Sequence, residues 1–197
     1  ILGLLVQAPN TEEQVHQGGA VGYVILGVGI LALLIALERF FSLMIMGAKI
    51  RRQLKDDVAR EDNPLGRVMK VKEQYPSVAY DTLELKLSEA ILREMPKITR
   101  NLTLIKIISV VAPLLGLLGT VTGMINTFQA ITLFGTGDPK LMAGGISQAL
   151  VTTVLGLVVA IPTVFLYTLL NTRSRNLLLI LQEQSAGIIA ERSEKGA

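Results

Sequence analysis

Two long runs without a charged residue dominate the hydrophobic pattern of the chain. No Asp, Glu, Lys, Arg or His occurs from Ile107 to Phe134 or from Leu141 to Thr172. Each run exceeds the roughly 20 apolar residues that cross a bilayer core. Gly135, Gly137 and Pro139 between them are typical of a turn. The pattern predicts a hairpin of two transmembrane helices, residues 107–134 and 142–172, with a loop at 135–141.

A further apolar stretch, residues 20–46, predicts another transmembrane helix. It is uncharged from Val21 to Leu37, and Glu38 and Arg39 then interrupt it. These two charges are expected either to pair with neighbouring groups or to extend toward the membrane surface. Basic residues follow directly from Lys49, which marks this end of the helix as the cytoplasmic one.

Residues 47–106 are polar and are expected to form a cytoplasmic helical domain. Asn63-Pro64 reads as an N-cap followed by Pro at the first helical position. From Ser77 onward apolar residues recur at helical spacing, interrupted by Glu94. Because no break follows in the pattern, one continuous helix is expected from this domain into the second span, with a kink at Pro96. Its buried face is expected to hold Leu83, Leu87, Ile91, Glu94, Ile98, Leu102 and Ile105.

The C-terminal residues 173–197 predict an amphipathic helix that continues the third span. Leu177, Leu181, Gln184 and Ile188 share one stripe of it. This stripe and the apolar face of the 47–106 domain are natural partners. The two long helices are therefore expected to extend into an intracellular helical bundle.

Composition supports an all-α integral membrane protein: half of the 197 residues are hydrophobic and the mean hydropathy is +0.51. Every basic residue except Lys140 lies between Arg39 and Lys106 or between Arg173 and Lys195. That distribution follows the positive-inside rule and places residues 1–19 outside, so it favours membrane topology over nucleic-acid binding. The cytoplasmic anchoring charges are Arg39, Lys49, Arg51, Arg52, Arg173 and Arg175.

The residue inventory argues against an enzyme. The chain has no Cys and a single His, His16, so a His dyad and a thiolate metal site are excluded within one chain. No GK[ST] phosphate-binding loop is present. We therefore expect no catalytic residue, no metal and no cofactor.

Small and polar residues form a stripe on each helix of the hairpin. One stripe holds Pro113, Gly116, Thr120, Gly123 and Thr127, and the other holds Ala149, Thr152, Thr153, Gly156, Ala160 and Thr163. One interpretation is close helix packing, in which Pro113, Gly116, Gly123 and Gly156 are the contact points. The other is a hydroxyl lining, since Thr120 and Thr153 fall at similar depth and form rings in a symmetric oligomer. Neither span holds an ionisable group, so the carrier of any transported proton must come from another chain.

The segments PLLGLLGTVTGMINTF (113–128) and GGISQALVTTVLGLVVAIP (144–162) resemble the MotA/TolQ/ExbB proton-channel family. The resemblance extends over about residues 19–190 and is strongest to its ExbB branch, especially the TtpC type. It implies a homopentamer in the inner membrane of a Gram-negative bacterium, with a periplasmic N-terminus and 135–141 loop. It also implies a central pore that holds a single-span ExbD-like partner, whose Asp carries the proton, and a TonB-like protein that receives the work.

The resemblance also assigns residues. The family's pore threonines match Thr120 and Thr153, with Gln148 and Thr152 close by. A transmembrane Glu of many members aligns with Gln148, which cannot ionise but can offer amide hydrogen bonds. The implied function is use of the proton motive force to energise TonB-dependent outer-membrane transport.

Three other functions remain open. A TolQ-like role in envelope maintenance lies within the same family, whereas a flagellar stator is disfavoured because that branch has four spans. A purely structural membrane scaffold would use the stripes for packing alone. A solute transporter is disfavoured because the chain lacks an inverted repeat.

Overall fold

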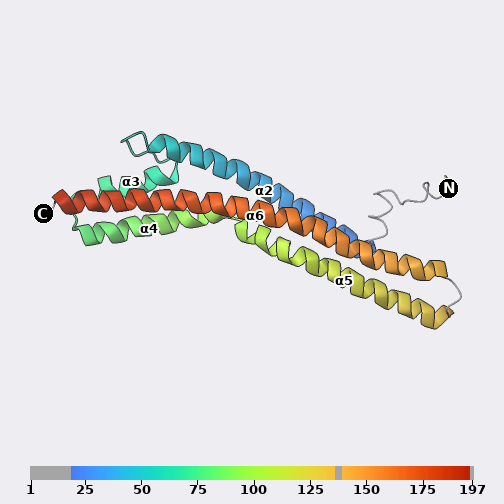
Figure 1. The fold of residues 1–197 in the computed structure, drawn as a ribbon. Coiled ribbons are helices and arrows are strands. Elements are labelled where there is room, and N and C mark those ends of the chain that lie inside the picture. The colour runs from blue at the N-terminus through green and yellow to red at the C-terminus, as the bar shows by residue number, and fades with distance from the viewer. Residues whose placement is uncertain (1–18, 136–138, 196–197) are drawn as a thin grey trace. The chain divides into compact units, whose positions relative to one another are not determined.

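The computed structural model describes residues 19–135 and 139–195. Its five helices are α2 (Gly19–Gln53), α3 (Pro64–Gln74), α4 (Tyr80–Thr99), α5 (Leu102–Phe134) and α6 (Pro139–Lys195) (Figure 1). The prediction of an all-α protein is confirmed for this part of the chain. His16, most of the expected 1–19 segment, residues 136–138 of the expected loop and the last two residues lie outside it.

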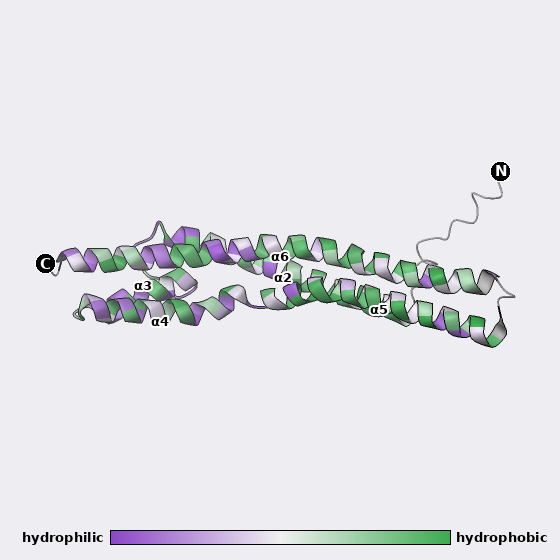
Figure 2. Cartoon of the chain, turned by 60° about the horizontal axis from the view of Figure 1, so that its bottom comes forward, coloured by the Kyte–Doolittle hydropathy of each residue, from purple (hydrophilic) through white to green (hydrophobic). Residues whose placement is uncertain are grey.

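Three helices are long and apolar enough to cross a membrane. The most apolar window of 18 residues has a mean hydropathy of 2.7 in α2, 2.2 in α5 (Leu102–Leu133) and 2.4 in α6 (Met142–Glu194). In Figure 2 the hydrophobic colour predominates on α5 and on the first half of α6, whereas hydrophilic and hydrophobic residues are mixed on α3 and α4. At most a third of each apolar window is buried within the chain, so most of its side chains are available to lipid or to other subunits. The chain is thus a multi-pass membrane protein.

The helices contribute to two compact units, which we describe separately. The apolar unit comprises residues 19–35, 104–135 and 139–166, and the polar unit comprises residues 36–103 and 167–195. Helices α2 and α6 take part in both.

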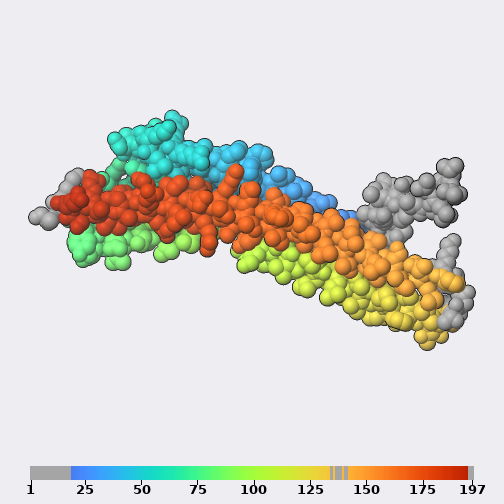
Figure 3. Space-filling model, viewed as in Figure 1, coloured from blue at the N-terminus to red at the C-terminus, as the bar shows by residue number. Residues whose placement is uncertain are grey.

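In the apolar unit, α5 and the first half of α6 form an antiparallel hairpin and lie in contact along their length (Figure 3). Gly116 lies against Thr152 and Gly156, and Gly123 lies against Ala149. Small side chains at these positions let the two backbones approach closely. Helix α2 packs on α6 in the same way, since Gly29 faces Val159.

The polar unit has an aliphatic core drawn from α3, α4 and α6. Leu65, Val68, Leu83, Leu87 and Leu181 are fully buried. The predicted buried face of α4 is confirmed, including Glu94 at 4% exposure. The predicted N-cap is confirmed as well, because the Asn63 side chain accepts a hydrogen bond of 2.8 Å from the backbone N–H of Gly66.

The prediction of one continuous helix from Ser77 into the second span is wrong. The chain leaves the helix at Arg100, and α5 begins at Leu102 after Asn101, whose φ is +60°. Asn is one of the few residues other than Gly that adopts this left-handed conformation readily, and it commonly ends helices there. The apolar spacing runs through the break unaltered, and for that reason periodicity alone does not reveal it.

Two other helices bind the carbonyl groups at this break. Arg39 of α2 donates to the carbonyl oxygen of Lys97 at 3.4 Å, and Ser174 of α6 donates to that of Ile98 at 3.5 Å. The last carbonyls of a helix have no partner within the helix, so these side chains replace the missing backbone bonds. The break is therefore a built junction of α4, α2 and α6.

Arg39 and Glu38 pair with each other. The Arg39 guanidinium donates two hydrogen bonds of 2.7 Å to the Glu38 carboxylate and a third, of 3.2 Å, to the Ser42 hydroxyl. Arg39 is only 3% exposed. A buried charge of this kind requires such a partner, because desolvation of an unpaired ion costs on the order of several kcal/mol.

Candidate functional site

The two small-residue stripes of the hairpin face each other. A methyl group added to Gly116 would lie 2.9 Å from the carbonyl oxygen of Thr152, and one on Gly156 would lie 2.7 Å from that of Ala112. Neither position has room for a side chain without a backbone shift. Pro113 lies half-buried inside α5, which continues through it. The predicted packing residues therefore lie at or beside the α5–α6 contact.

Thr120 and Thr153 meet at the centre of this contact. Their hydroxyl groups are hydrogen-bonded to each other, and the Thr120 hydroxyl also lies 2.9 Å from the Ala149 carbonyl oxygen and 3.2 Å from that of Gly116. Each hydroxyl has one proton to donate. The carbonyl oxygens and the other hydroxyl of the pair are alternative acceptors for these two protons. Both side chains are half-buried, which leaves part of each accessible from outside the chain.

Thr152 and Gln148 occupy different surroundings. Thr152 is 1% exposed and donates a 2.8 Å hydrogen bond to the Ala149 carbonyl oxygen. Gln148 is half-buried, and its amide lies against Gly19, a residue with φ +59°. Thr152 thus packs between the helices, whereas Gln148 lies where α2 begins.

Gly119 and Gly145 also belong to the contact, and sequence reasoning missed them. A methyl group on Gly119 would lie 2.5 Å from the Thr152 hydroxyl, and the Thr127 hydroxyl occupies the space beside Gly145. The signal was present, since Gly119 follows Gly116 at a helical spacing of three. A second polar stripe on α5, with Thr122, Asn126 and Gln129, faces outward from the chain.

The predicted anchoring charges separate into two groups. Arg39 is buried and paired with Glu38, and Lys49 lies 3.7 Å from the Asp62 carboxylate. Arg51, Arg52, Arg173 and Arg175 are exposed, and none forms an ion pair with a described residue.

Glu94 is the buried carboxylate of the polar unit, and two cations bind it. Arg67 donates hydrogen bonds of 2.9 and 2.6 Å to its two oxygens, and Lys97 donates one of 2.8 Å. Burial raises the pKa of Glu94, but the bonds from Arg67 and Lys97 outweigh burial, so its net pKa lies below the usual 4.5. In turn, the Glu94 carboxylate raises the pKa of Arg67. The pair joins α3 to α4 and is structural.

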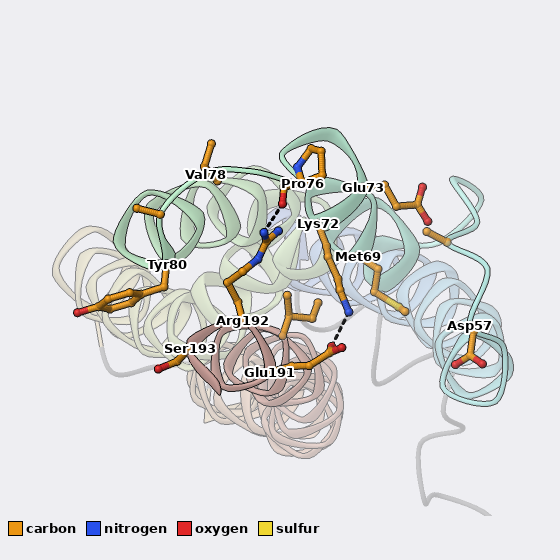
Figure 4. Close-up of a pocket in the computed structure, with 13 residues that line it drawn as sticks. Asp57, Met69, Lys72, Glu73, Pro76, Val78, Tyr80, Glu191, Arg192 and Ser193 are labelled. Atoms are coloured by element: carbon orange, nitrogen blue, oxygen red, sulfur yellow. Dashed lines mark hydrogen bonds and ion pairs between the residues drawn. The ribbon is translucent and has the colours of Figure 1, made fainter. Parts of the chain in front are cut away.

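A pocket of about 1180 Å³ lies in the polar unit beside the end of α6 (Figure 4). Three of the charged residues that line it form hydrogen bonds or ion pairs. Lys72 pairs with Glu191, and Arg192 donates hydrogen bonds to the carbonyl oxygens of Tyr75, at 3.1 Å, and Pro76. These contacts hold the end of α6 against the turn between α3 and α4, so we assign them to packing.

Comparison with known proteins gives the class of this chain. Residues 47–183 match the MotA/TolQ/ExbB proton channel family. This range includes both spans of the hairpin and most of the polar unit. The chain belongs to the MotA/TolQ/ExbB family, whose members are non-enzymatic subunits of membrane proton channels.

Individual relatives of this chain carry the names ExbB and TolQ. Biopolymer transport protein ExbB-like 3 of Synechocystis sp. is 32% identical over 189 residues, which cover 87% of this chain and 90% of the relative. The ExbB homolog of Methanothermobacter thermautotrophicus is 33% identical over 181 residues, covering 82% of this chain and 63% of the homolog. The Tol-Pal system protein TolQ of Pseudomonas aeruginosa is 31% identical over 103 residues, covering 52% of this chain and 45% of that protein.

Proposed function

We propose that this chain is the ExbB-type subunit of a complex that uses the proton motive force to energise TonB-dependent transport across an outer membrane. In this proposal it forms a homopentamer in the inner membrane of a Gram-negative bacterium, with its N-terminus in the periplasm. An ExbD-like single-span protein occupies the central pore, and a TonB-like protein receives the work. Similarity to proteins named ExbB over most of the chain favours this role.

One observation carries the proposal: the two spans of the hairpin contain paired hydroxyl groups but no ionisable side chain. Hydroxyls can order water and exchange hydrogen bonds, but they do not hold a transferable proton near neutral pH. The acid must therefore come from a partner helix. We assign the pore lining to Thr120 and Thr153, with Gln148 nearby as an amide partner and Thr152 behind them.

The energy available is adequate for such a task. One proton crossing 100 mV releases about 2.3 kcal/mol. A few protons per cycle can therefore drive a rearrangement of interfaces whose individual hydrogen bonds are worth about 1 kcal/mol each.

Reconstitution tests the proposal. The chain and a single-span partner bearing a transmembrane Asp are placed in liposomes with an internal pH-sensitive dye and an imposed potential. We expect no flux from the chain alone, flux with the partner, and none when that Asp is replaced by Asn. Flux from the chain alone would refute the assignment, and absence of flux from the intact pair would favour a structural scaffold.

A TolQ-like function is the second candidate, favoured by the match to TolQ of Pseudomonas aeruginosa. Genetic complementation distinguishes the TonB role from the Tol role. Restored growth on scarce iron complexes in a strain lacking its own ExbB supports the TonB role, whereas restored detergent resistance in a strain lacking TolQ supports the Tol role.

A further inference from the structure

An apolar groove whose lining includes two arginines runs between α2 and α6 in the polar unit. It has a volume of about 470 Å³. Leu43 and Met44 of α2 and Leu177 and Ile180 of α6 form its walls. The two helix segments lie side by side (Figures 1 and 3). The volume is within the range of sites that hold a small molecule or part of one.

The groove is open because two residues that line its α2 side, Gly47 and Ala48, are small. Gly47 has no side chain, and a methyl group there would make only an ordinary contact of 3.6 Å with Leu177. Ala48, the next lining residue, is exposed. A longer side chain at either position would occupy the space that is now open.

The charge of the groove is of one sign. Arg51 and Arg173 belong to its lining, and no acidic residue does. Most cations of the polar unit form an ion pair with a carboxylate: Arg39, Lys49, Arg60, Arg67, Lys70, Lys72, Lys86, Arg93 and Lys97. Arg51 and Arg173 form no ion pair with any described residue. The groove is therefore complementary to an anion that the chain itself does not supply.

Arg173 is held in place without losing its donors. Its guanidinium carbon lies 4.7 Å from the centre of the Phe40 ring, a cation–π contact. A guanidinium stacked in this manner keeps its N–H groups for an oxyanion, and these match a phosphate geometrically.

The position of the groove along the helices points to a lipid. Arg173 is the first charged residue after the uncharged run that ends at Thr172, which is where a spanning helix meets the headgroups. Exposed apolar side chains of α2 lead to the groove at helical spacing: Leu37, Phe41 and Met44 are 47%, 55% and 48% exposed. A phosphate at the arginines thus leaves a continuous apolar surface for an acyl chain.

We propose that this groove binds an anionic phospholipid, whose phosphate is held by Arg173 and Arg51 and whose acyl chain lies along α2 and α6. Basic sites between spanning helices near the cytoplasmic face recognise anionic headgroups by the same chemistry. The site does not depend on whether the complex serves a TonB or a Tol system, and it differs from the hydroxyl pair of the hairpin. Its effect is to fasten α2 to α6 at the membrane surface.

Native mass spectrometry of the detergent-purified chain tests this proposal, with phosphatidylglycerol and phosphatidylcholine of identical acyl chains as probes. We expect preferential binding of phosphatidylglycerol. The variant R51A/R173A should bind it about 25-fold more weakly, at about fivefold for each arginine. The matched control R52A/R175A removes the same charge from exposed, unpaired neighbours that do not line the groove, and it should bind nearly as the native chain does.

Ala48→Phe blocks the groove without changing the charge and should weaken phosphatidylglycerol binding by a similar factor. Circular dichroism and size-exclusion chromatography check that each variant is folded. If the two double variants lose phosphatidylglycerol binding equally, any positive charge near the membrane surface suffices for it. That result would overturn the proposal. Binding of sn-glycerol 3-phosphate as tight as that of the lipid, or native phosphatidylglycerol binding by a folded Ala48→Phe variant, would overturn it as well.

Discussion

The Thr120 hydroxyl is hydrogen-bonded to the Thr153 hydroxyl across the contact between α5 and α6. The two residues are 33 positions apart in the sequence and come from the two antiparallel helices of the hairpin. Thr120 also reaches the Ala149 carbonyl oxygen of α6, so it bonds to a side chain and to the backbone of its neighbour. In spans without ionisable groups, this pair is a polar link between the two helices.

Replacement of Thr153 by Val tests the pair directly. Valine keeps the shape of threonine but removes the hydroxyl, so Thr120 loses its side-chain partner while the small-residue packing persists. We expect proton flux of the reconstituted complex to fall about tenfold or more, as follows from the loss of a hydrogen bond worth about 1.5 kcal/mol in the transition state. Thr120→Val should have the same effect.

Thr122→Val is the matched control for these variants. Thr122 lies on the exposed side of α5, and its hydroxyl bonds only to carbonyl oxygens of its own helix, Leu118 at 2.9 Å and Gly119 at 3.1 Å. Its removal should leave flux within about twofold of native, since no contact between helices is lost. Native flux in Thr153→Val, or equal loss in all three variants, would exclude a specific role for the pair.

Close packing of the hairpin predicts a large effect of one methyl group at Gly116. In Gly116→Ala the new methyl group would lie 2.9 Å from the Thr152 carbonyl oxygen, a backbone atom that cannot rotate away. We expect a loss of about 1–3 kcal/mol in the free energy of unfolding, typical of overpacking. Thermal unfolding in detergent measures the change.

Gly144→Ala provides the comparison for Gly116, because nothing lies within 4 Å of the position of its new methyl group. Alanine favours the helix over glycine by about 0.5–1 kcal/mol, so this variant should unfold at the same or a higher temperature. Similar losses at both positions would mean that the small-residue stripe is not the packing surface.

The sequence was sufficient to predict features that depend on neighbouring residues alone. The three apolar helices follow from long uncharged runs, and the burial of Leu83, Leu87 and Ile98 follows from their helical spacing. The Asn63 cap is likewise a local signal. The meeting of Thr120 and Thr153 agrees with their expected equal depth.

Features that depend on distant residues could not be predicted in the same way. Glu94 and its partner Arg67 are separated by 27 positions and come from different helices. Nothing in the α4 pattern indicates which cation faces this carboxylate. The same holds for Arg39 and Ser174, which bind the carbonyl groups at the end of α4.

The Glu94 pair predicts acid sensitivity of the polar unit. Because the pKa of Glu94 lies below its usual 4.5 in the folded chain, the unfolded chain takes up this proton first as the pH falls. The stabilisation by the carboxylate is therefore complete above pH 4.5 and is lost as the pH falls from 4.5 through the folded pKa. Thermal unfolding between pH 7 and pH 3 should show this loss.

The variant Glu94→Gln separates this carboxylate from all others. At pH 7 it should be less stable than the native chain by about 1–2 kcal/mol, a value reduced because Arg67 is one-third exposed. The difference should shrink below pH 4.5, as native Glu94 becomes protonated. In the control Glu89→Gln, an exposed carboxylate with partners Lys86 and Arg93 is lost, and the difference should stay small throughout. A constant Glu94→Gln difference down to pH 3 would contradict the assigned pKa direction.

The break between α4 and α5 depends on the left-handed conformation of Asn101, and substitutions there distinguish a built junction from an accidental one. Asn101→Gly keeps access to φ +60° and should retain native stability, whereas Asn101→Val introduces a β-branched residue that adopts this conformation poorly. We expect Asn101→Val to lose about 1–2 kcal/mol. It should also accelerate hydrogen exchange at residues 97–102, because strain at position 101 loosens the junction in which Arg39 and Ser174 bind the Lys97 and Ile98 carbonyl groups. If Asn101→Val is instead as stable as Asn101→Gly and its exchange slows, the continuous helix is accessible to the chain and the junction is not required for folding.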